Sequence, residues 1–334
     1  MLEPPELPEE QLRACLRDAY GFEPATLAFL PLGADTSTAV YRAVAPDGEA
    51  SFIKLRRGAF NGVSVAFPRW LSDRGMETII PPLPTTAGQL WTQLGPFTVV
   101  RYPFVAGADA YGTPLSERQW HSFGAAVRQL HSATPPAALG QAIRHETYGD
   151  EARRQVRALL AQLPAPPDAI AARAAVGLQA HRETILALVE RAETLARRLR
   201  DDARPTVICH GDLHAGNLLI DAEGHLYLVD WDTLIRAPRE RDLMFIGGGQ
   251  GFVGVSPDEE TRLFYAGYGP AQLDQVALAY YRYERIVQDI AAFGEELILG
   301  GAGGADREQS LRYLMANFAP GGTIAIATGA DAAR

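Results

Sequence analysis

The stretch from residue 207 to residue 232 constrains the fold of this chain more than any other. It contains three short apolar runs with the length and composition of β-strands, at 207–209, 218–220 and 226–229. The turn Asp221-Ala-Glu-Gly224 joins the second run to the third as a hairpin. A polar loop separates the first run from the second. The stretch therefore predicts a strand, a loop and a hairpin, with polar groups at the strand ends.

Three polar residues at these strand ends carry the chemistry. Asp212 and Asn217 belong to the loop and are five residues apart, and Asp230 directly follows the third run. The carboxylate of Asp212 can orient and deprotonate a hydroxyl, while oxygens of Asn217 and Asp230 are hard donors that suit Mg²⁺. The same spacing separates the aspartate and asparagine of the protein-kinase catalytic loop, so the pattern indicates phosphoryl transfer.

Two motifs in this stretch resemble a known family. His210-Gly-Asp-Leu-His-Ala-Gly-Asn217 with Val229-Asp-Trp-Asp232 is similar to the aminoglycoside phosphotransferase and choline kinase family. The runs 236–249 and 280–289 further resemble the spectinomycin phosphotransferases within that family. The resemblance extends over most of the chain. It implies an enzyme that phosphorylates an alcohol group.

The resemblance implies an α+β fold of the protein-kinase kind with two lobes. A small, β-rich amino-terminal lobe at 1–104 would bind the nucleotide. A larger, helical carboxy-terminal lobe at 105–334 would carry catalysis and substrate binding, with a helical insertion at about 148–200.

Apolar residues at helical spacing predict helices along the chain. The predicted helices are 8–20, 116–132, 150–163, 168–200, 270–299 and 305–318. The helix at 116–132 begins with Ser116-Glu-Arg-Gln119, which has the pattern of a capping box. The tail after Pro320 is expected to cover the core loosely.

The family resemblance also implies roles for single residues. Asp212 matches the group that orients or deprotonates the acceptor hydroxyl, and Asn217 and Asp230 match the Mg²⁺ ligands. The co-substrate would be ATP or GTP. Asp242 matches a residue that braces the catalytic loop by hydrogen bonds. Apart from the resemblance, His210 and His214 are interpreted as further hydrogen-bonding braces of this loop.

The chain contains a single lysine, Lys54, among 31 basic residues. It lies in the predicted strand Ser51-Phe-Ile-Lys-Leu55. A compact ammonium fits between phosphate oxygens in a way that the planar guanidinium of arginine does not. By resemblance to the family, Lys54 would hold the α- and β-phosphates of the nucleotide. The alternative is a solvated lysine on an ordinary strand.

Two segments are candidates for further contacts with the nucleotide. The loop 33–38, between two predicted strands, has small residues whose backbone N–H groups can approach phosphate oxygens. The run 101–105 matches the hinge that meets an adenine edge. The candidate residues are Gly33, Asp35, Thr36, Ser37, Tyr102 and Phe104. An ordinary hairpin and a buried strand followed by a loop would give the same patterns.

One feature of the family pattern is missing. A glutamate on the helix after the lysine strand normally pairs with the lysine, but no glutamate occurs between Leu55 and Met76. Either Asp73 or Glu77 substitutes for it, or other groups position Lys54.

The resemblance implies a compact cationic aminocyclitol, similar to spectinomycin, as the acceptor. Aromatic faces and carboxylates suit an alkylammonium ligand, and both occur on the predicted helix at 270–299. The candidate substrate contacts are Asp232, Tyr281, Glu284 and Asp289. The alternative places the tyrosines in the core and pairs Arg285 with Asp289 on the helix surface.

Composition limits the partners. The net charge of −9 argues against a nucleic-acid surface. No apolar run reaches about eighteen residues, so no membrane span is predicted. The two cysteines are far apart in apolar elements, and the first residues do not resemble a signal peptide, which favours the cytoplasm. The expected partner is a small cationic molecule, with a monomer or a dimer as the assembly.

The residues leave other functions open. A kinase of choline, a sugar or an amino-acid derivative would use the same catalytic groups. A catalytically silent nucleotide-binding module would explain the missing glutamate, but it has no need for Lys54, Asp212, Asn217 and Asp230 together. A zinc site is disfavoured, because His210 and His214 lie in a loop with no third soft ligand nearby.

Overall fold

The structure, a computed structural model, describes residues 2–32, 37–163, 166–248, 252–300 and 304–332. The chain packs as two compact units, each built from three segments. The amino-terminal unit comprises residues 1–113, 134–143 and 215–234. The carboxy-terminal unit comprises residues 114–133, 144–214 and 235–334. The chain leaves the carboxy-terminal unit and enters the amino-terminal unit inside the motif at 210–217, between His214 and Ala215. The lobe boundary predicted at residue 104 stays a prediction.

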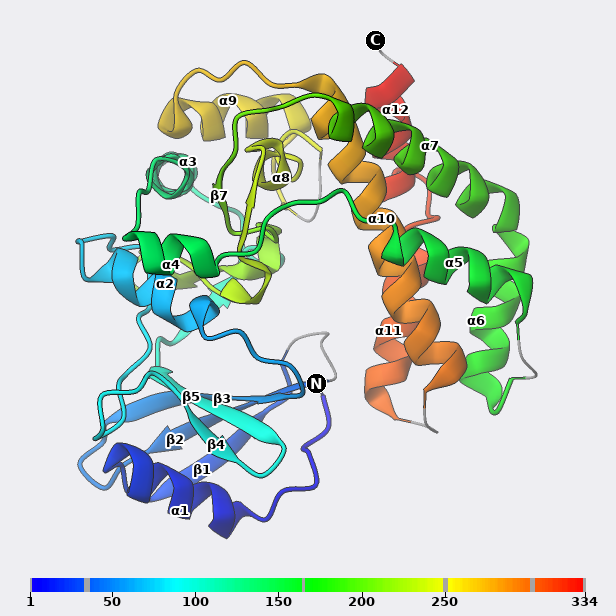
Figure 1. The fold of residues 1–334 in the computed structure, drawn as a ribbon. Coiled ribbons are helices and arrows are strands. Elements are labelled where there is room, and N and C mark those ends of the chain that lie inside the picture. Colours follow the sequence, from blue (N-terminus) through cyan, green and yellow to red (C-terminus); the bar gives the residue numbers. More distant parts are fainter. Residues whose placement is uncertain (1, 33–36, 164–165, 249–251, 301–303, 333–334) are drawn as a thin grey trace. The chain divides into compact units, whose positions relative to one another are not determined.

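The amino-terminal unit is built around an antiparallel five-stranded sheet (Figure 1). Its helices are α1 (Glu9–Tyr20), α2 (Val63–Ser72) and α4 (Ala137–Ala142), with the short 3₁₀ helices η1 (Ala215–Asn217) and η2 (Trp231–Thr233). Its strands are β1 (Thr26–Leu30), β2 (Thr38–Val44), β3 (Ala50–Arg57), β4 (Thr92–Leu94), β5 (Phe97–Pro103), β6 (Gly107–Asp109), β8 (Leu218–Asp221) and β9 (Leu226–Leu228).

The strand order of the large sheet is β1-β2-β3-β5-β4, which places β3 in the middle. Lys54 on β3 pairs with Val40 on β2 and with Val100 on β5. Successive side chains of a strand point to opposite faces. On β3 the buried residues alternate with Lys54 and Arg56, so both basic side chains lie on the face opposite the buried one.

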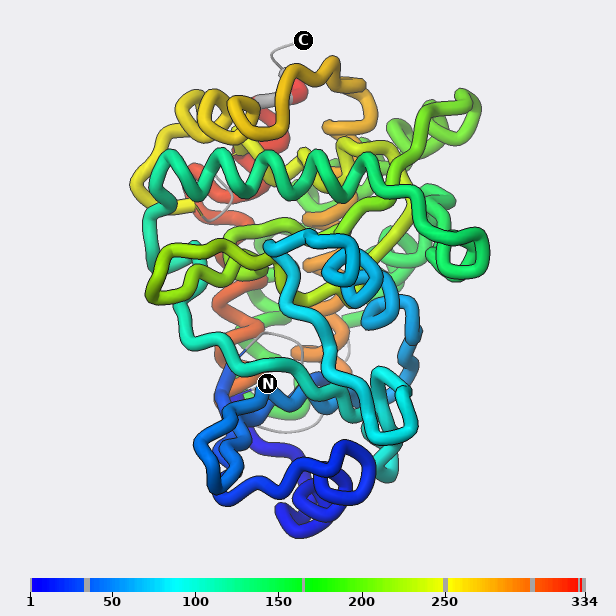
Figure 2. The backbone as a smooth tube through the Cα atoms, turned by 90° about the vertical axis from the view of Figure 1, so that its left-hand side faces the viewer, coloured from blue at the N-terminus to red at the C-terminus, as the bar shows by residue number. Residues whose placement is uncertain are grey.

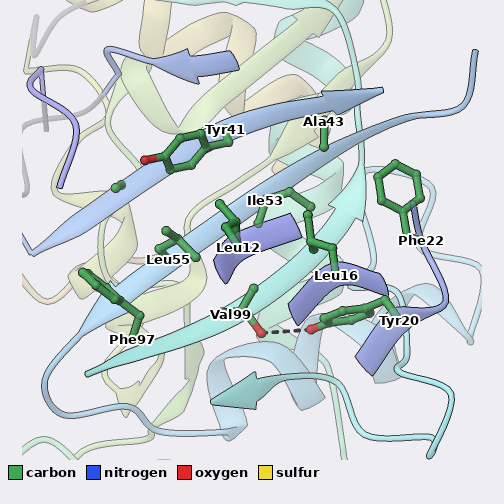
Figure 3. Packing of buried hydrophobic residues seen from close by; sticks show 11 residues of the cluster. Leu12, Leu16, Tyr20, Phe22, Tyr41, Ala43, Ile53, Leu55, Phe97 and Val99 are labelled. Carbon is green, nitrogen blue, oxygen red and sulfur yellow. Dashed lines mark hydrogen bonds between the residues drawn. The ribbon is translucent and has the colours of Figure 1, made fainter. Parts of the chain in front are cut away.

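Helix α1 covers the buried face of this sheet (Figure 3). Its Leu12 and Leu16 pack with Ile53 of β3 and Val99 of β5. The hydroxyl of Tyr20 at the end of α1 donates a hydrogen bond to the carbonyl of Val99, at 2.9 Å. Each fully buried aliphatic side chain contributes roughly 1.5–3 kcal/mol, so this packing fixes the strand that carries Lys54.

A second, three-stranded sheet in the order β6-β8-β9 carries the hairpin that the motif predicted. Leu218 and Leu228 are paired at its open end. The N–H of Leu228 also donates a hydrogen bond to the carbonyl of Thr78, at 2.9 Å. The hairpin is thus tied to the rest of the unit at the end where Asn217 and Asp230 lie.

The carboxy-terminal unit is mainly helical. Its helices are α3 (Glu117–His131), α5 (Glu151–Ala161), α6 (Ala169–Ala180), α7 (Arg182–Asp201), α8 (Glu240–Leu243), α9 (Pro257–Tyr268), α10 (Gln275–Leu299), α11 (Ala305–Ala316) and α12 (Thr323–Ala332). Its two strands, β7 (Val207–Cys209) and β10 (Ile235–Ala237), form an antiparallel pair. Helix α10 lies in the middle of this unit, with α5, α7, α11 and α12 packed around it (Figure 1).

Helices α3 and α9 run side by side in this unit (Figure 2). Glycines allow them to approach closely. A Cβ atom at Gly124 of α3 would lie 2.2 Å from the carbonyl oxygen of Phe264, and one at Gly267 of α9 would lie 2.0 Å from that of His121. Any larger residue would push the helices apart. This crossing positions His131 at the end of α3, which reaches the site described below.

The structure confirms the predicted α+β fold, with an antiparallel sheet in the amino-terminal unit and helices in the carboxy-terminal unit. It also confirms the capping box of α3, because the side chains of Ser116 and Gln119 each accept a hydrogen bond from the backbone N–H of the other. None of the helices formed by the described residues combines the length and the apolar character that a bilayer crossing requires.

Two helix predictions and the prediction for the carboxy-terminal tail were wrong in part. The helix predicted at 168–200 is two helices, because the backbone leaves helical geometry at His181, whose ring stacks on Phe318 at 4.1 Å. The helix predicted from 270 begins at Gln275, where the carboxylate of Asp274 caps it. The tail after Pro320 is the helix α12, and its Asp331 is held by both Nε and Nη2 of Arg191.

Candidate active site

The hairpin β8–β9 ends at Asp230, whose backbone adopts a left-handed conformation (φ 64°, ψ 70°). This conformation is uncommon outside glycine, although aspartate tolerates it better than most residues. Trp231 fixes the turn: its Nε1 donates to the carbonyl of Leu228 at 3.1 Å, and its ring packs against Phe67 of α2. The turn leaves the carboxylate side chain of Asp230 53% exposed, so it can meet a ligand.

Lys54 is held by the two aspartates of this turn. Its Nζ lies 2.9 Å from Oδ1 of Asp230 and 2.8 Å from Oδ2 of Asp232. Nη1 of Arg56, two residues further along β3, lies 2.7 Å from the same Oδ2 of Asp232. The period of two in strand β3 places both cations on one face. We call these four residues, Lys54, Arg56, Asp230 and Asp232, the lysine cluster.

The electrostatics of the lysine cluster keep Lys54 charged. Burial alone would lower the pKa of Lys54, but the carboxylates of Asp230 and Asp232 outweigh that effect and raise the pKa above its ordinary value. Only 15% of the Lys54 side chain is exposed. The cluster therefore presents a fixed ammonium, suited to an anionic group, next to an accessible carboxylate.

The glutamate that normally pairs with this lysine is missing, and the structure shows which groups position Lys54 instead. Asp230 and Asp232 do so, from the hairpin and not from the helix after β3. Asp73 pairs instead with Arg69 on α2, at 2.9 Å. Substitution of the glutamate by Asp73 was therefore the wrong alternative, and positioning by other groups is what the structure shows.

Asn217 lies at the other strand end of the same hairpin. It is buried, and its backbone carbonyl accepts a hydrogen bond from the N–H of Val229, at 3.0 Å. Asn217 and Asp230 therefore leave paired strands side by side. An amide oxygen and a carboxylate oxygen are hard donors, so the residues present fit a Mg²⁺ ion in chemical type.

Asp212 belongs to the carboxy-terminal unit, in the loop after β7. Its Oδ1 accepts a hydrogen bond from Nη1 of Arg285 on α10, a contact that the sequence did not predict. Its Oδ2 lies 3.6 Å from Nε2 of His214. Burial would raise the pKa of Asp212, but Arg285, His214 and His210 outweigh burial and hold the pKa below its ordinary value. The carboxylate is thus ionised at neutral pH and can accept a hydrogen bond from a hydroxyl.

Asp242 on α8 holds the backbone of this loop. Its carboxylate accepts hydrogen bonds from the backbone N–H groups of His210, at 2.9 Å, and Gly211, at 2.7 Å. Nε2 of His131 on α3 lies 3.0 Å from the same carboxylate, a second contact without a sequence signal. Gly211 has a φ of 88°, which other residues rarely adopt. This backbone conformation lets the N–H groups of the loop reach the carboxylate of Asp242.

The side chains of His131, Cys209 and Asp242 are close enough together for a metal ion. Asp242 is already engaged by the hydrogen bonds of the loop. The thiol of Cys209 is also engaged, because its Sγ donates to the carbonyl of Pro238 at 3.6 Å. Among the described residues, neither His210 nor His214 belongs to such a cluster. A hydrogen-bonded brace explains these groups better than zinc does.

The loop predicted to approach the phosphates lies mostly outside the described residues. This applies to Gly33, Asp35 and Thr36. Ser37 lies in the turn before β2, where its carbonyl accepts a hydrogen bond from the N–H of Arg57, at 2.8 Å. The nucleotide contacts of all four residues stay predictions.

The predicted hinge is engaged within the sheet. The N–H of Phe104 donates to the carbonyl of Ala50 at 3.1 Å, and the guanidinium of Arg42 lies 4.9 Å from the centre of the Phe104 ring. The ring of Tyr102 meets that of Phe52 edge-on, at 6.4 Å. A contact between the N–H of Phe104 and an adenine would require its present bond to break, so the roles of Tyr102 and Phe104 stay predictions.

Two of the predicted substrate contacts are corrected by the structure. Tyr281 is fully buried in α10, and Glu284 is 3% exposed. Glu284 accepts a hydrogen bond from Nη1 of Arg153 on α5, which is itself fully buried. Tyr281 lies instead beside Arg241 of α8, whose guanidinium is 5.6 Å from the centre of its ring. The alternative that places the tyrosines in the core is therefore confirmed for Tyr281.

Asp289 and Asp232 are partly exposed but already paired. Oδ1 of Asp289 lies 3.0 Å from Nε of Arg285, which confirms the predicted pair on one helix face. Asp232 is held by Lys54 and Arg56. Contacts of these two carboxylates with a substrate stay predictions.

Residues 31–286 match the phosphotransferase enzyme family, which is most of the chain. The protein belongs to this family and is a small-molecule phosphotransferase.

Several individual proteins are similar to this chain. A spectinomycin phosphotransferase solved with ADP and spectinomycin is 34% identical, with a TM-score of 0.86 and coverage of 96% of this chain and 98% of that chain. An amicoumacin kinase is 16% identical with a TM-score of 0.65 and 95% coverage of each chain, and it shares the fold. The protein StrN of Streptomyces griseus is 28% identical over 234 residues, 65% of this chain and 67% of that protein.

Proposed function

We propose that this phosphotransferase transfers the γ-phosphoryl group of ATP to a ring hydroxyl of a compact cationic aminocyclitol of the spectinomycin kind. The observation that carries the proposal is the 34% identity, over nearly the whole of both chains, to a protein whose solved complex contains ADP and spectinomycin. In the reaction, the acceptor oxygen forms a bond to the γ-phosphorus while the bond to the β,γ-bridging oxygen breaks, and ADP leaves.

The lysine cluster supports the nucleotide part of the proposal. Lys54 offers a fixed ammonium for the α- and β-phosphates, and such a point charge is common in phosphate sites. Asn217 and Asp230 would hold Mg²⁺, which when bound neutralises charge on the phosphate oxygens. The same groups would bind the phosphates of GTP equally well, so the preference for adenine or guanine depends on contacts outside this cluster.

Asp212 supports the acceptor part of the proposal. Phosphoryl transfer depends mainly on positioning and on electrostatic stabilisation, and the protein supplies one group that orients the attacking hydroxyl. Asp212 is ionised at neutral pH and is held by Arg285, while Asp242 fixes the loop that carries it. Its carboxylate would accept the hydrogen bond, and finally the proton, of the acceptor hydroxyl.

A cationic acceptor requires negative charge near this hydroxyl. Asp289 and Asp232 are the predicted carboxylates that remain partly exposed, whereas the buried Tyr281 and Glu284 drop out of the proposal. Asp289 is the better candidate, because Asp232 is shared between two cations of the lysine cluster.

The test is a coupled assay of ADP release with spectinomycin, choline and kanamycin offered separately. The rate without an acceptor is subtracted, and Asp212→Asn serves as the inactive control. We expect release that depends on spectinomycin. Release that depends only on choline or only on kanamycin, or release with none of the three, would overturn the acceptor assignment.

A further inference from the structure

Arg285 lies between two carboxylates of the carboxy-terminal unit. Its Nη1 donates a hydrogen bond to Oδ1 of Asp212, and its Nε lies 3.0 Å from Oδ1 of Asp289. A guanidinium presents its donors in a rigid fork, so it can hold two carboxylates at a fixed angle, which an ammonium cannot do. Its side chain is 26% exposed, and most of it is therefore shielded from water.

The backbone that carries Arg285 is itself fixed against the segment after α8. Arg282, three residues earlier on α10, donates from Nε to the carbonyl of Met244 and from Nη2 to that of Ile246, both at 3.1 Å. Residues three apart share a helix face. Phe245 lies between Met244 and Ile246 in the sequence, and the centre of its ring is 5.9 Å from the guanidinium of Arg285. Arg285 thus rests on the same segment that anchors its helix.

We propose that Arg285 is a positioning residue, which fixes the carboxylate of Asp212 by one oxygen so that the other oxygen meets the acceptor hydroxyl. The proposal rests on the role of Asp212 given above. The terminal torsion of an aspartate is broad, so a carboxylate on a loop rotates unless it is held. Phosphoryl transfer needs the attacking oxygen in line, and a misplacement of about 1 Å can cost on the order of a hundredfold in rate.

The charges around Asp212 give the contact a signature in pH. The groups that face Asp212 or its partner come from its own loop, from α10 and from α8: His210, His214, Arg285, Asp289 and Arg241. Of the groups that lower the pKa of Asp212, Arg285 has the largest effect. Its removal therefore raises this pKa, and the carboxylate is protonated at a higher pH than in the unchanged protein.

The kinetic test compares Arg285→Gln, Arg285→Lys and Asp289→Asn with Arg154→Gln. Arg154 is an exposed residue of α5, and its substitution removes the same charge from the same unit. For Arg285→Gln we expect kcat to fall roughly 10- to 100-fold with the nucleotide KM unchanged, because alignment is lost and binding is not. The acid limb of its kcat profile moves to higher pH. Arg285→Lys recovers part of the loss, Asp289→Asn shows a smaller loss, and Arg154→Gln shows none.

A second measurement needs no substrate and so separates this proposal from the proposed function. The carboxyl carbons of aspartate are labelled, and the signal of Asp212 is identified by its absence in Asp212→Asn. We expect its NMR titration midpoint to lie higher in Arg285→Gln than in the unchanged protein and in Arg154→Gln. An unchanged midpoint with an unchanged kcat profile would overturn the proposal. If no acceptor is phosphorylated but the midpoint moves, the acceptor assignment fails and the contact between Arg285 and Asp212 stands.

Discussion

The lysine cluster of the amino-terminal unit and the Asp212–Arg285–Asp289 group of the carboxy-terminal unit solve the same physical problem in opposite ways. Each holds a charged group largely out of water, where an unpaired charge is costly. In the first, the ammonium of Lys54 is flanked by two carboxylates. In the second, the carboxylate of Asp212 is held by a guanidinium that a second carboxylate holds in turn.

The difference lies in where the partners come from. In the lysine cluster, Lys54 and Arg56 are two residues apart on one strand, and Asp230 and Asp232 are two residues apart on one turn. Short sequence periods therefore bring each pair to one side. Asp212 and Arg285 are 73 residues apart, and only the packing of α10 brings them together. Lys54 and Asp230 are themselves 176 residues apart, so the contacts between the two pairs of the lysine cluster also depend on the fold of their unit. Local backbone geometry there brings only the two like charges of each pair to one side.

The largest loss is expected for Asp212→Asn, which removes the functional carboxylate of the second group. A positioned base contributes roughly 10²- to 10⁴-fold, so turnover should fall by that order while nucleotide binding survives. Steady-state kinetics and calorimetry of Mg·ATP binding measure the two effects. Turnover like that of the unchanged protein, in a folded variant, would remove Asp212 from the reaction.

Asp230→Ala tests the lysine cluster from the side of its exposed carboxylate. The main anionic oxygen donor of the proposed Mg²⁺ site is lost, so metal-dependent nucleotide binding should disappear. Calorimetry with ATP in the presence of Mg²⁺, and with EDTA as the control, measures this. Unchanged Mg·ATP affinity would contradict the placement of the metal.

Lys54→Arg keeps the charge of the cluster and changes only its shape. A planar fork does not reproduce a point charge between two carboxylates, so phosphate alignment should suffer. We expect kcat/KM for the nucleotide to fall on the order of tenfold to a hundredfold, as for other small misplacements of reacting groups. If the KM rises less than about twofold and kcat stays the same, Lys54 is a bystander.

Asp232→Asn should have a smaller effect, because Asp230 still holds Lys54. The loss of one of two carboxylates loosens the ammonium, and we expect the nucleotide KM to rise several-fold with a modest change in kcat. Asp73→Asn is the matched control, since Asp73 pairs with Arg69 and not with Lys54. Equal kinetics for the two variants would show that Asp232 does not position the lysine.

Glu284→Gln should have the smallest effect on turnover and a large effect on stability. It leaves the fully buried Arg153 without its charged partner, and breaking a buried ion pair costs about 3–5 kcal/mol. Thermal unfolding should show a lower Tm, while the acceptor KM of the folded protein stays the same. A raised acceptor KM with an unchanged Tm would return Glu284 to the substrate site.

The sequence predicted most of the elements because their signals are local. The capping box at Ser116 and the strand that carries Lys54 depend on neighbouring residues, and both are confirmed. The break at His181 was missed because the apolar period continues on both sides of it, and the ring of His181 finds its partner, Phe318, far along the chain.

In the candidate site too, the residues that are close in sequence were predictable, and the contacts between distant segments were not. The spacing of Asp212, Asn217 and Asp230 follows from one loop and one hairpin, so their identity was readable. The partners of Asp212 and Asp242 were not, because Arg285 and His131 come from distant helices. The tyrosine-rich run of α10 misled the substrate prediction, since aromatic residues on a central helix serve packing as readily as recognition.

The central claim is transfer of a phosphoryl group to an alcohol, and ³¹P NMR of the protein with Mg·ATP and spectinomycin tests it most directly. The account predicts that the γ-phosphate signal of ATP declines while a phosphomonoester signal of the aminocyclitol grows, and that neither change occurs with Asp212→Asn. Growth of inorganic phosphate alone, at the same rate with and without spectinomycin, would contradict it.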